Sequence, residues 1–418
     1  MNFAIVRYLI GWMLGIESIF LLLPALTAVI YGEPELPAYL IAAAISLAGA
    51  ALLCHRKPKN TRFYAREGYV TVALCWLILA VIGALPFVLS REIPFFIDAL
   101  FETVSGFTTT GATILGDVEA LSHASMLWRC LTHWVGGMGV LVFMLIVLPL
   151  AGGQTIFLMR AESPGPSVSK MSPHMRDTAT ILYAIYFGLT VLQMILLFIG
   201  GMPFFDAICV SLGTAGTGGF GNWNDSIAHY NSAYLQNVIT VFMILFGINF
   251  SAYFLILTRK FRQAFRIEEI RVYLGVIFVF AGLIAFNVRP MFGSLRESFH
   301  HALFQVASII TTTGFSTVDF DQWPTFSRAL LVLLMFIGAC AGSTGGGIKC
   351  SRILLLGKSV KKELMCLIHP RLVRVNKMDG QRVPHEVMRS INVFVVAYAF
   401  IFILSLLIIS LNCEDLVT

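Results

Sequence analysis

Charged residues are scarce in this chain. Asp, Glu, Lys and Arg together make up only 12% of its 418 residues, whereas hydrophobic residues make up 57%. A soluble domain carries about 25% charged residues, because its surface has to face water. Several apolar runs also reach the roughly 20 residues that a helix needs to cross the hydrocarbon core of a bilayer. The composition therefore excludes a soluble domain and predicts an all-α polytopic membrane protein.

Paired cysteines and catalytic clusters are also missing. The eight cysteines are scattered without a Cys-x-x-Cys pair, so we predict buried thiols rather than disulfides or metal ligands. The first apolar run, residues 3–31, is too long for a cleavable signal sequence, and we interpret it as a first membrane helix. No Ser/His/Asp, His/Glu/His or paired-carboxylate set falls on adjacent predicted helices. We therefore expect neither an enzyme nor a covalently bound cofactor.

The basic residues gather in a few connections between apolar runs. These connections are residues 56–66, 259–271 and 349–389. By the positive-inside rule they face the cytoplasm, where they can anchor the chain on anionic lipid, dock a cytoplasmic partner, or do both. The acidic or neutral connections are residues 32–35, 116–119 and 221–225, and we expect them outside. This topology puts the N-terminus in the cytoplasm. It also explains the net charge of +6 by the basic cytoplasmic connections, without a nucleic-acid partner.

One pattern, an apolar run that ends in a Gly-centred polar loop, occurs three times. The copies are Phe-Thr-Thr-Thr-Gly-Ala-Thr at 107–113, Gly-Thr-Gly-Gly-Phe-Gly at 216–221 and Thr-Thr-Thr-Gly-Phe-Ser at 311–316. In each copy a short apolar stretch opens 13 residues before the key glycine, at Asp98, Asp206 and His301. A helix of that length, at ~1.5 Å per residue, is too short to cross a hydrocarbon core of ~30 Å. The pattern therefore predicts re-entrant helices that end at membrane depth.

The loops have the chemistry of a site for a dehydrated monovalent cation. Backbone carbonyls can replace the water of such an ion without fixed negative charge, and glycine permits the positive φ that aims successive carbonyls at one axis. The threonines can brace the loop or add a hydroxyl ligand. The alternative is a set of ordinary extracellular turns, which three copies in matched context disfavour. The candidate filter residues are Thr109, Thr110, Gly111, Thr217, Gly218, Gly219, Thr312, Thr313 and Gly314.

The predicted organisation is a series of repeated helix, pore-loop, helix units around a central ion pathway. Irregular backbone at membrane depth is tolerated only where it is buried in protein or lines a water-filled cavity. We therefore expect the loops to line one common axis. We expect an N-terminal helix pair at 1–65, pore units at 66–152, 153–258 and 259–357, a cytoplasmic connection at 358–388, and the first helix of a fourth unit at 389–418. The spacing within each unit would place a fourth key glycine beyond Thr418. We therefore expect the chain to stop before its fourth pore loop.

Five motifs resemble those of the Trk/Ktr/HKT superfamily of potassium transporters, and most closely its bacterial TrkH-type subunits. They are Asp98-Ala-Leu-Phe-Glu-Thr-Val-Ser-Gly-Phe-Thr-Thr-Thr-Gly-Ala-Thr, Trp134-Val-Gly-Gly-Met-Gly, Arg160-Ala-Glu-Ser-Pro-Gly-Pro, Ile310-Thr-Thr-Thr-Gly-Phe and Cys340-Ala-Gly-Ser-Thr-Gly-Gly-Gly-Ile-Lys. The resemblance implies a homodimer in which each protomer holds one potassium pathway made from four units. It implies that Gly111, Gly219 and Gly314 are filter glycines. The second filter departs from the others, with Gly218 where they have Thr110 and Thr313.

A Gly-rich segment at 340–349, here called the gate loop, interrupts the apolar run from 325 to 357. It lacks the Gly-x-x-x-x-Gly-Lys-Ser/Thr spacing of a phosphate-binding loop, and no strand precedes it. So many Gly and Ser residues break a helix. The resemblance implies an intramembrane gate, and the alternative is a packing kink. The candidate gate residues are Gly342, Ser343, Thr344, Gly345, Gly346, Gly347 and Lys349, of which Lys349 could tune cation entry by its charge.

Four ionisable residues at membrane depth need an explanation, because burying a charge there costs much free energy unless the charge is paired. We predict a contact between Glu102 and Arg129 that braces the first filter, with separate partners as the alternative. We expect Glu17 and His133 to be satisfied by polar neighbours or water rather than by ions in transit.

The leading functional hypothesis is potassium uptake across the cytoplasmic, or inner, membrane, with the potassium ion as substrate. The resemblance implies cytoplasmic TrkA-type nucleotide-binding regulatory subunits on the basic inner face, in addition to membrane lipid. The alternative is a proton- or sodium-coupled potassium symporter, which should show midplane carboxylates. We find no carboxylate pair in the predicted spans that suits such coupling.

Overall fold

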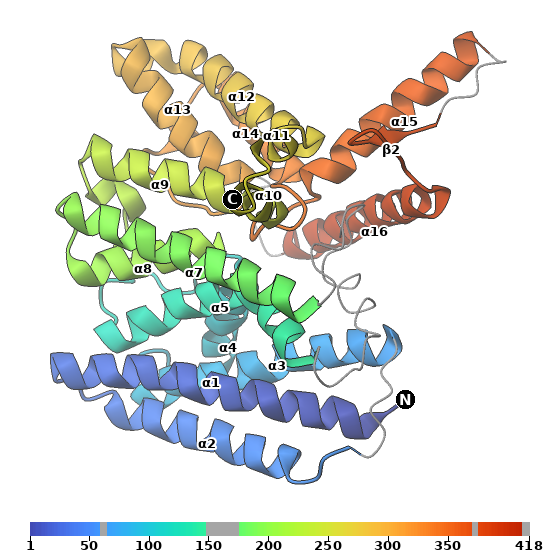
Figure 1. The fold of residues 1–418 in the computed structure, drawn as a ribbon. Coiled ribbons are helices and arrows are strands. Elements are labelled where there is room, and N and C mark those ends of the chain that lie inside the picture. Colours follow the sequence, from blue (N-terminus) through green and yellow to red (C-terminus); the bar gives the residue numbers. More distant parts are fainter. Residues whose placement is uncertain (59–64, 148–174, 370–374, 412–418) are drawn as a thin grey trace.

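The computed structural model describes residues 1–58, 65–147, 175–369 and 375–411. Figure 1 shows α1 and α2 at one end of the molecule, α3 to α9 in the middle, and α12 to α14 at the other end, with α15 projecting away. Three predicted features lie outside the described residues: the motif that begins at Arg160, the basic residues Lys59 and Arg62, and the segment after Leu411.

Helices make up most of the described chain. The longer ones are α1 (Phe3–Tyr31), α2 (Leu36–Cys54), α3 (Ala65–Ser90), α5 (His123–Val147), α7 (Met175–Ile199), α12 (Glu268–Phe292), α15 (Cys350–Ile368) and α16 (His385–Ile409). The shorter ones are α4 (Phe96–Phe107), α8 (Phe204–Gly216), α9 (Ala233–Phe246), α10 (Phe250–Leu257), α11 (Phe261–Ala264), α13 (Leu295–Ile310) and α14 (Thr325–Ile337). Two 3₁₀ turns, η1 (Ser226–His229) and η2 (Phe320–Gln322), and one hairpin, β1 (Lys377–Met378) with β2 (Gln381–Arg382), complete the described elements.

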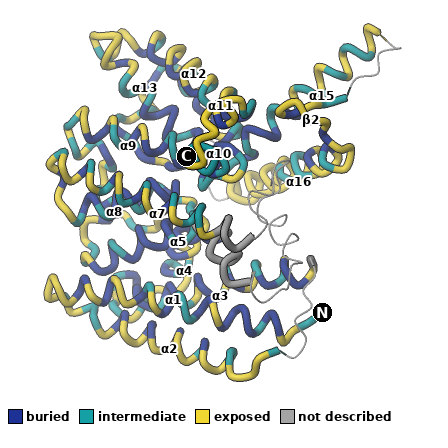
Figure 2. Tube along the Cα trace, viewed as in Figure 1, coloured by how far each residue is buried: buried dark blue, intermediate teal, exposed yellow. Residues whose placement is uncertain are grey.

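Six helices in the described part of the chain are long and apolar enough to cross a membrane. The pair α9 and α10 would add a seventh span if it is counted as one bent element. Their outward faces are apolar: in α16, for example, the side chains of Val396, Phe400 and Leu407 are exposed (Figure 2). Lipid tails can cover such faces, whereas water cannot do so without a large cost. The protein is therefore a multi-pass membrane protein.

Each short helix that precedes a Gly loop packs against two or three other helices. The helix α4 contacts α3 and α5, α8 contacts α5, α7 and α9, and α13 contacts α9, α12 and α14. An acidic residue stands in the first turn of each, namely Asp98, Asp206 and Glu297. Acidic side chains there stabilise the positive end of the helix dipole. The opposite, negative end of each helix points into its Gly loop, which favours a cation there.

The apolar segment 232–258 is not one continuous helix, because the chain bends by 93° between α9 and α10. A methyl group added at Gly247 would lie 2.2 Å from the hydroxyl of Tyr273, so the lack of a side chain at Gly247 lets this hydroxyl approach the backbone. The side chain of Asn249 then caps α10 by accepting a hydrogen bond of 2.8 Å from the Ser251 N–H.

The helix after the gate loop is longer than the predicted span, which ended at 357. It continues as α15 to Ile368, and the segment 358–388 therefore also holds the hairpin and the start of α16. Lys358 stabilises this arrangement by an ion pair with Glu268 and by donating a hydrogen bond of 2.8 Å to the carbonyl of Lys377. The extra helical turns carry Lys and Glu, which favour helix even where the hydrophobic pattern of a span has ended.

Candidate cation pathway

The three pore helices end in the same backbone turn. In each, the residue just before the key glycine donates a backbone hydrogen bond to the residue five positions earlier. The pairs are Thr110 to Ser105 at 2.9 Å, Gly218 to Gly213 at 3.0 Å, and Thr313 to Ser308 at 2.9 Å. The sequence repeat is therefore a repeat of hydrogen bonding and not only of composition.

The backbone angles repeat as well. The key glycines Gly111, Gly219 and Gly314 have φ of 77°, 83° and 88°. Two residues earlier, Thr109, Thr217 and Thr312 also have positive φ, at 53°, 54° and 59°. Positive φ at a β-branched residue is strained, and such strain persists only where the surrounding structure holds it. The residue between them has no positive φ, so each loop alternates between two kinds of backbone conformation.

The loops meet one another directly. A methyl group added at Gly111 would lie 2.0 Å from the carbonyl oxygen of Gly218, and one at Gly219 would lie 1.9 Å from that of Thr313. The first loop therefore contacts the second, and the second contacts the third, in the same relative orientation. A methyl group added at Gly314 would have no atom of the described residues within 4 Å. The structure thus brings together the three predicted filter segments.

The departure of the second loop from the pattern has a steric cause. A side chain at Gly218 would lie 2.4 Å from the ring of His133 in α5. This ring stacks on Phe220 at 4.0 Å between centroids, and its Nδ1 lies 3.4 Å from the Phe220 N–H. The imidazole therefore occupies the space that a threonine fills in the other two loops.

Hydroxyl groups brace the loops from behind. Ser105 donates a hydrogen bond of 2.5 Å to the carbonyl of Ala112, and Ser308 donates one of 2.6 Å to the carbonyl of Phe315. The threonines also bond among themselves, with Thr108 Oγ1 2.8 Å from Thr110 Oγ1, and Thr311 Oγ1 2.7 Å from Thr313 Oγ1. Of the two predicted uses of these hydroxyls, the hydrogen bonds favour bracing of the loop.

The predicted contact between Glu102 and Arg129 is confirmed. Their side chains, 0% and 2% exposed, meet at 2.7 Å. Glu102 also accepts hydrogen bonds of 3.0 Å from the Thr113 hydroxyl and 3.1 Å from the Ile114 N–H. The Arg129 guanidinium lies 4.1 Å above the ring of Phe220. The pair therefore connects the segment after Gly111 with the segment after Gly219.

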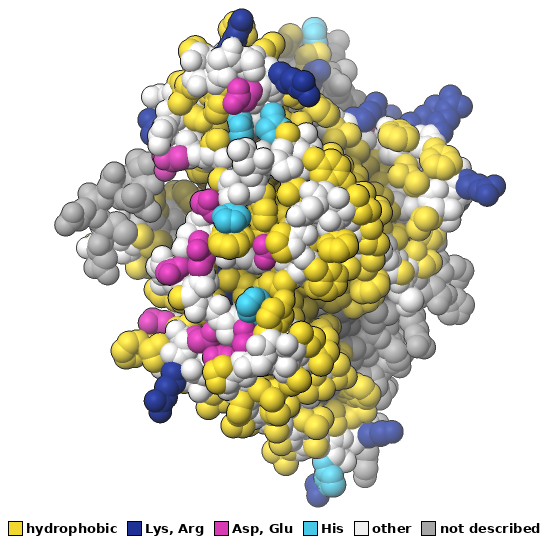
Figure 3. All heavy atoms as spheres, turned by 90° about the vertical axis from the view of Figure 1, so that its left-hand side faces the viewer, with side chains coloured by type: hydrophobic (Ala, Val, Ile, Leu, Met, Phe, Trp, Pro, Cys, Tyr) yellow, Lys and Arg dark blue, Asp and Glu magenta, His cyan; other side chains and the backbone are white. Residues whose placement is uncertain are grey.

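The connections that follow the first and second key glycines form hydrogen bonds with each other. Asn224 donates a hydrogen bond of 2.7 Å to the Asp117 carboxylate and accepts one of 2.9 Å from the Val118 N–H. The Asn224 amide holds the pKa of the Asp117 carboxyl below its ordinary value, because it stabilises the charged form. Figure 3 shows the face on which the α1–α2 connection lies, with acidic side chains and histidines along its middle and Lys and Arg toward its margins. Such a face attracts cations.

The gate loop lies against the third filter segment. The Gly346 N–H donates a hydrogen bond of 2.7 Å to the hydroxyl of Thr312. A methyl group added at Gly345 would lie 3.0 Å from the carbonyl oxygen of Thr311. Lys349 folds its ammonium back onto the carbonyl of Gly345.

The rest of the loop bonds to its surroundings. Ser343 donates to the Cys340 carbonyl at 2.6 Å, and Thr344 donates to the Phe246 carbonyl at 3.2 Å. Gly342 and Gly347 have φ of 72° and 78°, which glycine adopts without cost. The predicted gate residues therefore form one folded segment beside the third Gly loop.

Sequence reasoning missed the residues that receive this loop. Gly247 accepts a hydrogen bond of 3.0 Å from the Cys340 N–H, and the Phe250 N–H donates one of 2.9 Å to the Gly342 carbonyl. Asn249 and Glu269 stand beside them. The polar break Gly247-Ile-Asn249 within an apolar run was a signal for a bend. Glu269 gave no such signal, because it lies among the basic residues of a connection.

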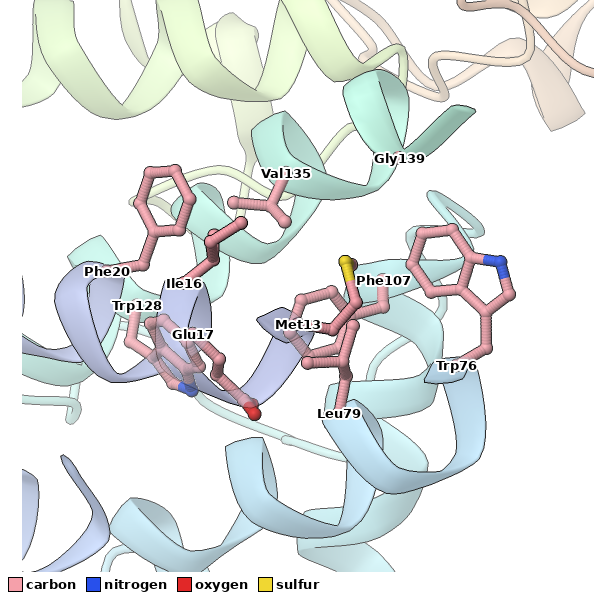
Figure 4. A pocket seen from close by; sticks show the side chains of 10 residues that line it. All are labelled: Met13, Ile16, Glu17, Phe20, Trp76, Leu79, Phe107, Trp128, Val135 and Gly139. Atoms are coloured by element: carbon pink, nitrogen blue, oxygen red, sulfur yellow. The ribbon is translucent and has the colours of Figure 1, made fainter. Parts of the chain in front are cut away.

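A separate pocket behind the first pore helix is not part of this pathway. Figure 4 shows its lining, which is apolar except for one carboxyl. The lining residues are Met13, Ile16, Glu17, Phe20, Trp76, Leu79, Phe107, Trp128, Val135 and Gly139. Its volume of about 20 Å³ has room for about one water molecule. Glu17, 3% exposed, accepts a long hydrogen bond of 3.5 Å from Ser46 at one oxygen, so a polar neighbour meets it in part. Its other oxygen and the Nε2 of His133 are buried without a hydrogen-bond partner among the described residues.

A multi-pass helical membrane protein with re-entrant helices and close-packed Gly loops belongs to the class of membrane transport proteins. The family model TrkH, described as a cation transport protein, matches residues 37–417. The chain therefore belongs to the TrkH family, as its motifs indicated.

Individual relatives agree over nearly the whole chain. The Trk system potassium uptake protein TrkH of Salmonella typhimurium is 37% identical over 99% of this chain and 87% of the relative. The TrkG protein of Escherichia coli K12, also named a Trk system potassium uptake protein, is 33% identical over 99% of this chain and 86% of the relative. The crystal structure of the potassium transporter TrkH from Vibrio parahaemolyticus superposes with a TM-score of 0.89 at 31% identity, covering 99% of this chain and 87% of that one.

Proposed function

We propose that this protein takes up potassium across the cytoplasmic membrane through a filter of backbone carbonyls. The observation that carries the proposal is the direct contact of three loops with matching φ angles and matching hydrogen bonds. Carbonyls turned to one axis can replace the hydration shell of a monovalent cation. The relatives named above are potassium uptake proteins or a potassium transporter, which supports potassium as the ion.

The proposed ligands are the backbone oxygens of the three filter segments, with Gly111, Gly219 and Gly314 at their centres. Thr109, Thr217 and Thr312 precede these glycines with positive φ, which supports an alternation of carbonyl directions. Gly218 differs from its counterparts in side chain only, because its backbone turn is the same. Its carbonyl therefore takes the same role as those of Thr110 and Thr313.

The gate loop is the proposed barrier below this filter. Its contact with Thr312 and the positive charge of Lys349 support an obstruction that also repels cations. Deletion of Gly345–Gly347 should raise potassium flux and weaken its dependence on regulatory subunits, because the barrier shortens while the filter stays. A normally expressed deletion variant without a rise in flux would favour a packing kink instead.

The proposed assembly is a homodimer that carries TrkA-type nucleotide-binding subunits on its inner face, with the N-terminus in the cytoplasm. Supporting features are the projecting α15 and its basic residues Lys358, Lys361 and Lys362. Copurification of the subunits with the tagged full-length protein tests the assembly, and its loss at high salt would indicate the electrostatic contact.

The uptake itself is tested in cells that lack their own potassium uptake systems. Expression of the full-length protein with its regulatory subunits should restore growth at low potassium and rubidium uptake. Normal membrane expression without uptake would overturn the proposed function.

A further inference from the structure

Glu269 is a buried carboxylate that binds both ends of the gate loop. It is the second residue of α12 and is 1% exposed. One of its oxygens, Oε1, accepts a hydrogen bond of 2.6 Å from the Ala341 N–H and another of 3.0 Å from the Ser351 N–H. Ala341 is the second residue of the loop, and Ser351 lies two residues beyond its end. A single side chain of α12 therefore binds both ends of the loop.

The charge of Glu269 is stabilised by this closed arrangement. A carboxylate in a membrane interior is costly unless donors satisfy it, and removing its donors costs more than removing a neutral pair. The Ser351 N–H belongs to the first turn of α15, where the helix dipole favours negative charge. Movement of the loop away from α12 would remove both N–H donors at once.

The loop is also strained at the point that Glu269 holds. Lys349 has φ of 80° and ψ of 132°, a conformation that side-chain-bearing residues rarely adopt. Strain of this kind persists only where surrounding contacts impose it. The contacts next to Lys349 include its own bond to Gly345, the bond of 2.9 Å from the Cys350 N–H to the Ala339 carbonyl, and the bond from Ser351 to Glu269. Release of the carboxylate would remove one of these contacts.

We infer that Glu269 is a latch that holds the gate loop in its obstructing position, and that opening requires the Ala341 and Ser351 N–H groups to leave it. This inference rests on the proposed function of the gate loop. Glu269 acts as a positioning residue, because it contacts the loop and not the ion path. The adjacent Glu268 offers a matched control, since it is 31% exposed and pairs with Lys358 on α15 instead of with the loop.

The first test compares Glu269→Gln with Glu268→Gln in the full-length protein, without regulatory subunits. Glu269→Gln keeps the shape but removes the charge, so maximal rubidium uptake should rise roughly tenfold, as expected for losing charged hydrogen bonds. The KM for the ion should stay unchanged, because the filter is untouched. Glu268→Gln should behave as the unmodified protein. Equal uptake in both variants and in the unmodified protein would overturn the latch.

A second test does not depend on flux. Cys340 and Cys350 flank the loop and are 0% and 1% exposed. In a full-length protein whose other cysteines are replaced, maleimide should label these thiols several-fold faster with Glu269→Gln than with Glu268→Gln. Glu269→Asp, which keeps the charge but shortens the reach, should give an intermediate labelling rate if Glu269→Gln folds poorly. Unchanged labelling would refute the latch even if uptake is normal, whereas absent uptake with faster labelling would refute only the proposed function.

Discussion

At the scale of single residues, the key glycines differ from ordinary turn glycines in their surroundings. A methyl group at Gly111 would meet the Gly218 carbonyl at 2.0 Å, whereas one at Gly116, in the same connection, meets no atom within 4 Å among the described residues. Gly116 also lacks the positive φ of Gly111. The two positions therefore separate the effect of the filter from the general effect of adding a side chain to this loop.

We expect Gly111→Ala to lower potassium selectivity and to destabilise the loop by at least about 1–2 kcal/mol, the cost of a left-handed conformation for an alanine. Gly116→Ala should leave both properties unchanged. Rubidium uptake in competition with sodium and thermal unfolding in detergent measure the two effects. Equal selectivity in both variants would argue against the filter assignment of Gly111.

The ion pair between Glu102 and Arg129 gives a second prediction at this scale. Removal of either partner leaves a buried charge, which costs about 3–5 kcal/mol, whereas removal of both leaves none. Glu102→Ala and Arg129→Ala should therefore each destabilise the protein strongly, and the double variant should be much less destabilised than the sum of the two. Thermal unfolding of the four proteins measures this coupling, and strictly additive effects would contradict it.

At the scale of elements, the bend between α9 and α10 supports the gate loop. Asn249, 6% exposed, caps α10, and Phe250 bonds to Gly342. Asn249→Ala should cost about 1 kcal/mol of capping energy and loosen this support, so flux without regulatory subunits should rise. Ser232→Ala removes the corresponding cap of α9, away from the gate loop, and should not raise flux. A similar rise in both variants would show that the effect is not specific to the bend.

The elements also show which features local sequence determines. The short helix predicted before the second Gly loop is found at Phe204–Gly216, because its apolar run and its flanking Pro and Gly are local signals. The close approach of the Tyr273 hydroxyl to Gly247 was not predictable in this way, because Tyr273 belongs to a later helix. The glycine at 218 likewise depends on His133, far away in the chain. The pairing of Glu102 with Arg129 was predictable because buried charges at this depth need partners.

At the scale of the whole molecule, the distribution of charge predicts the topology. Gly116 lies in an exposed connection near acidic residues, and Lys361 lies on α15 among basic ones. In right-side-out vesicles, a membrane-impermeant maleimide should label Gly116→Cys but not Lys361→Cys, and inverted vesicles should give the opposite result. Labelling of both from one side would contradict the proposed orientation.

The central claim is that three Gly loops from different parts of the chain form one potassium-selective path. Its most direct test is the reversal potential of currents through the reconstituted full-length protein under opposing potassium and sodium gradients, at several proton gradients. We predict a reversal potential that follows the potassium gradient alone and that moves toward zero in Gly111→Ala and Gly219→Ala. A reversal potential that follows sodium or protons, or that is unchanged in both variants, would contradict the account.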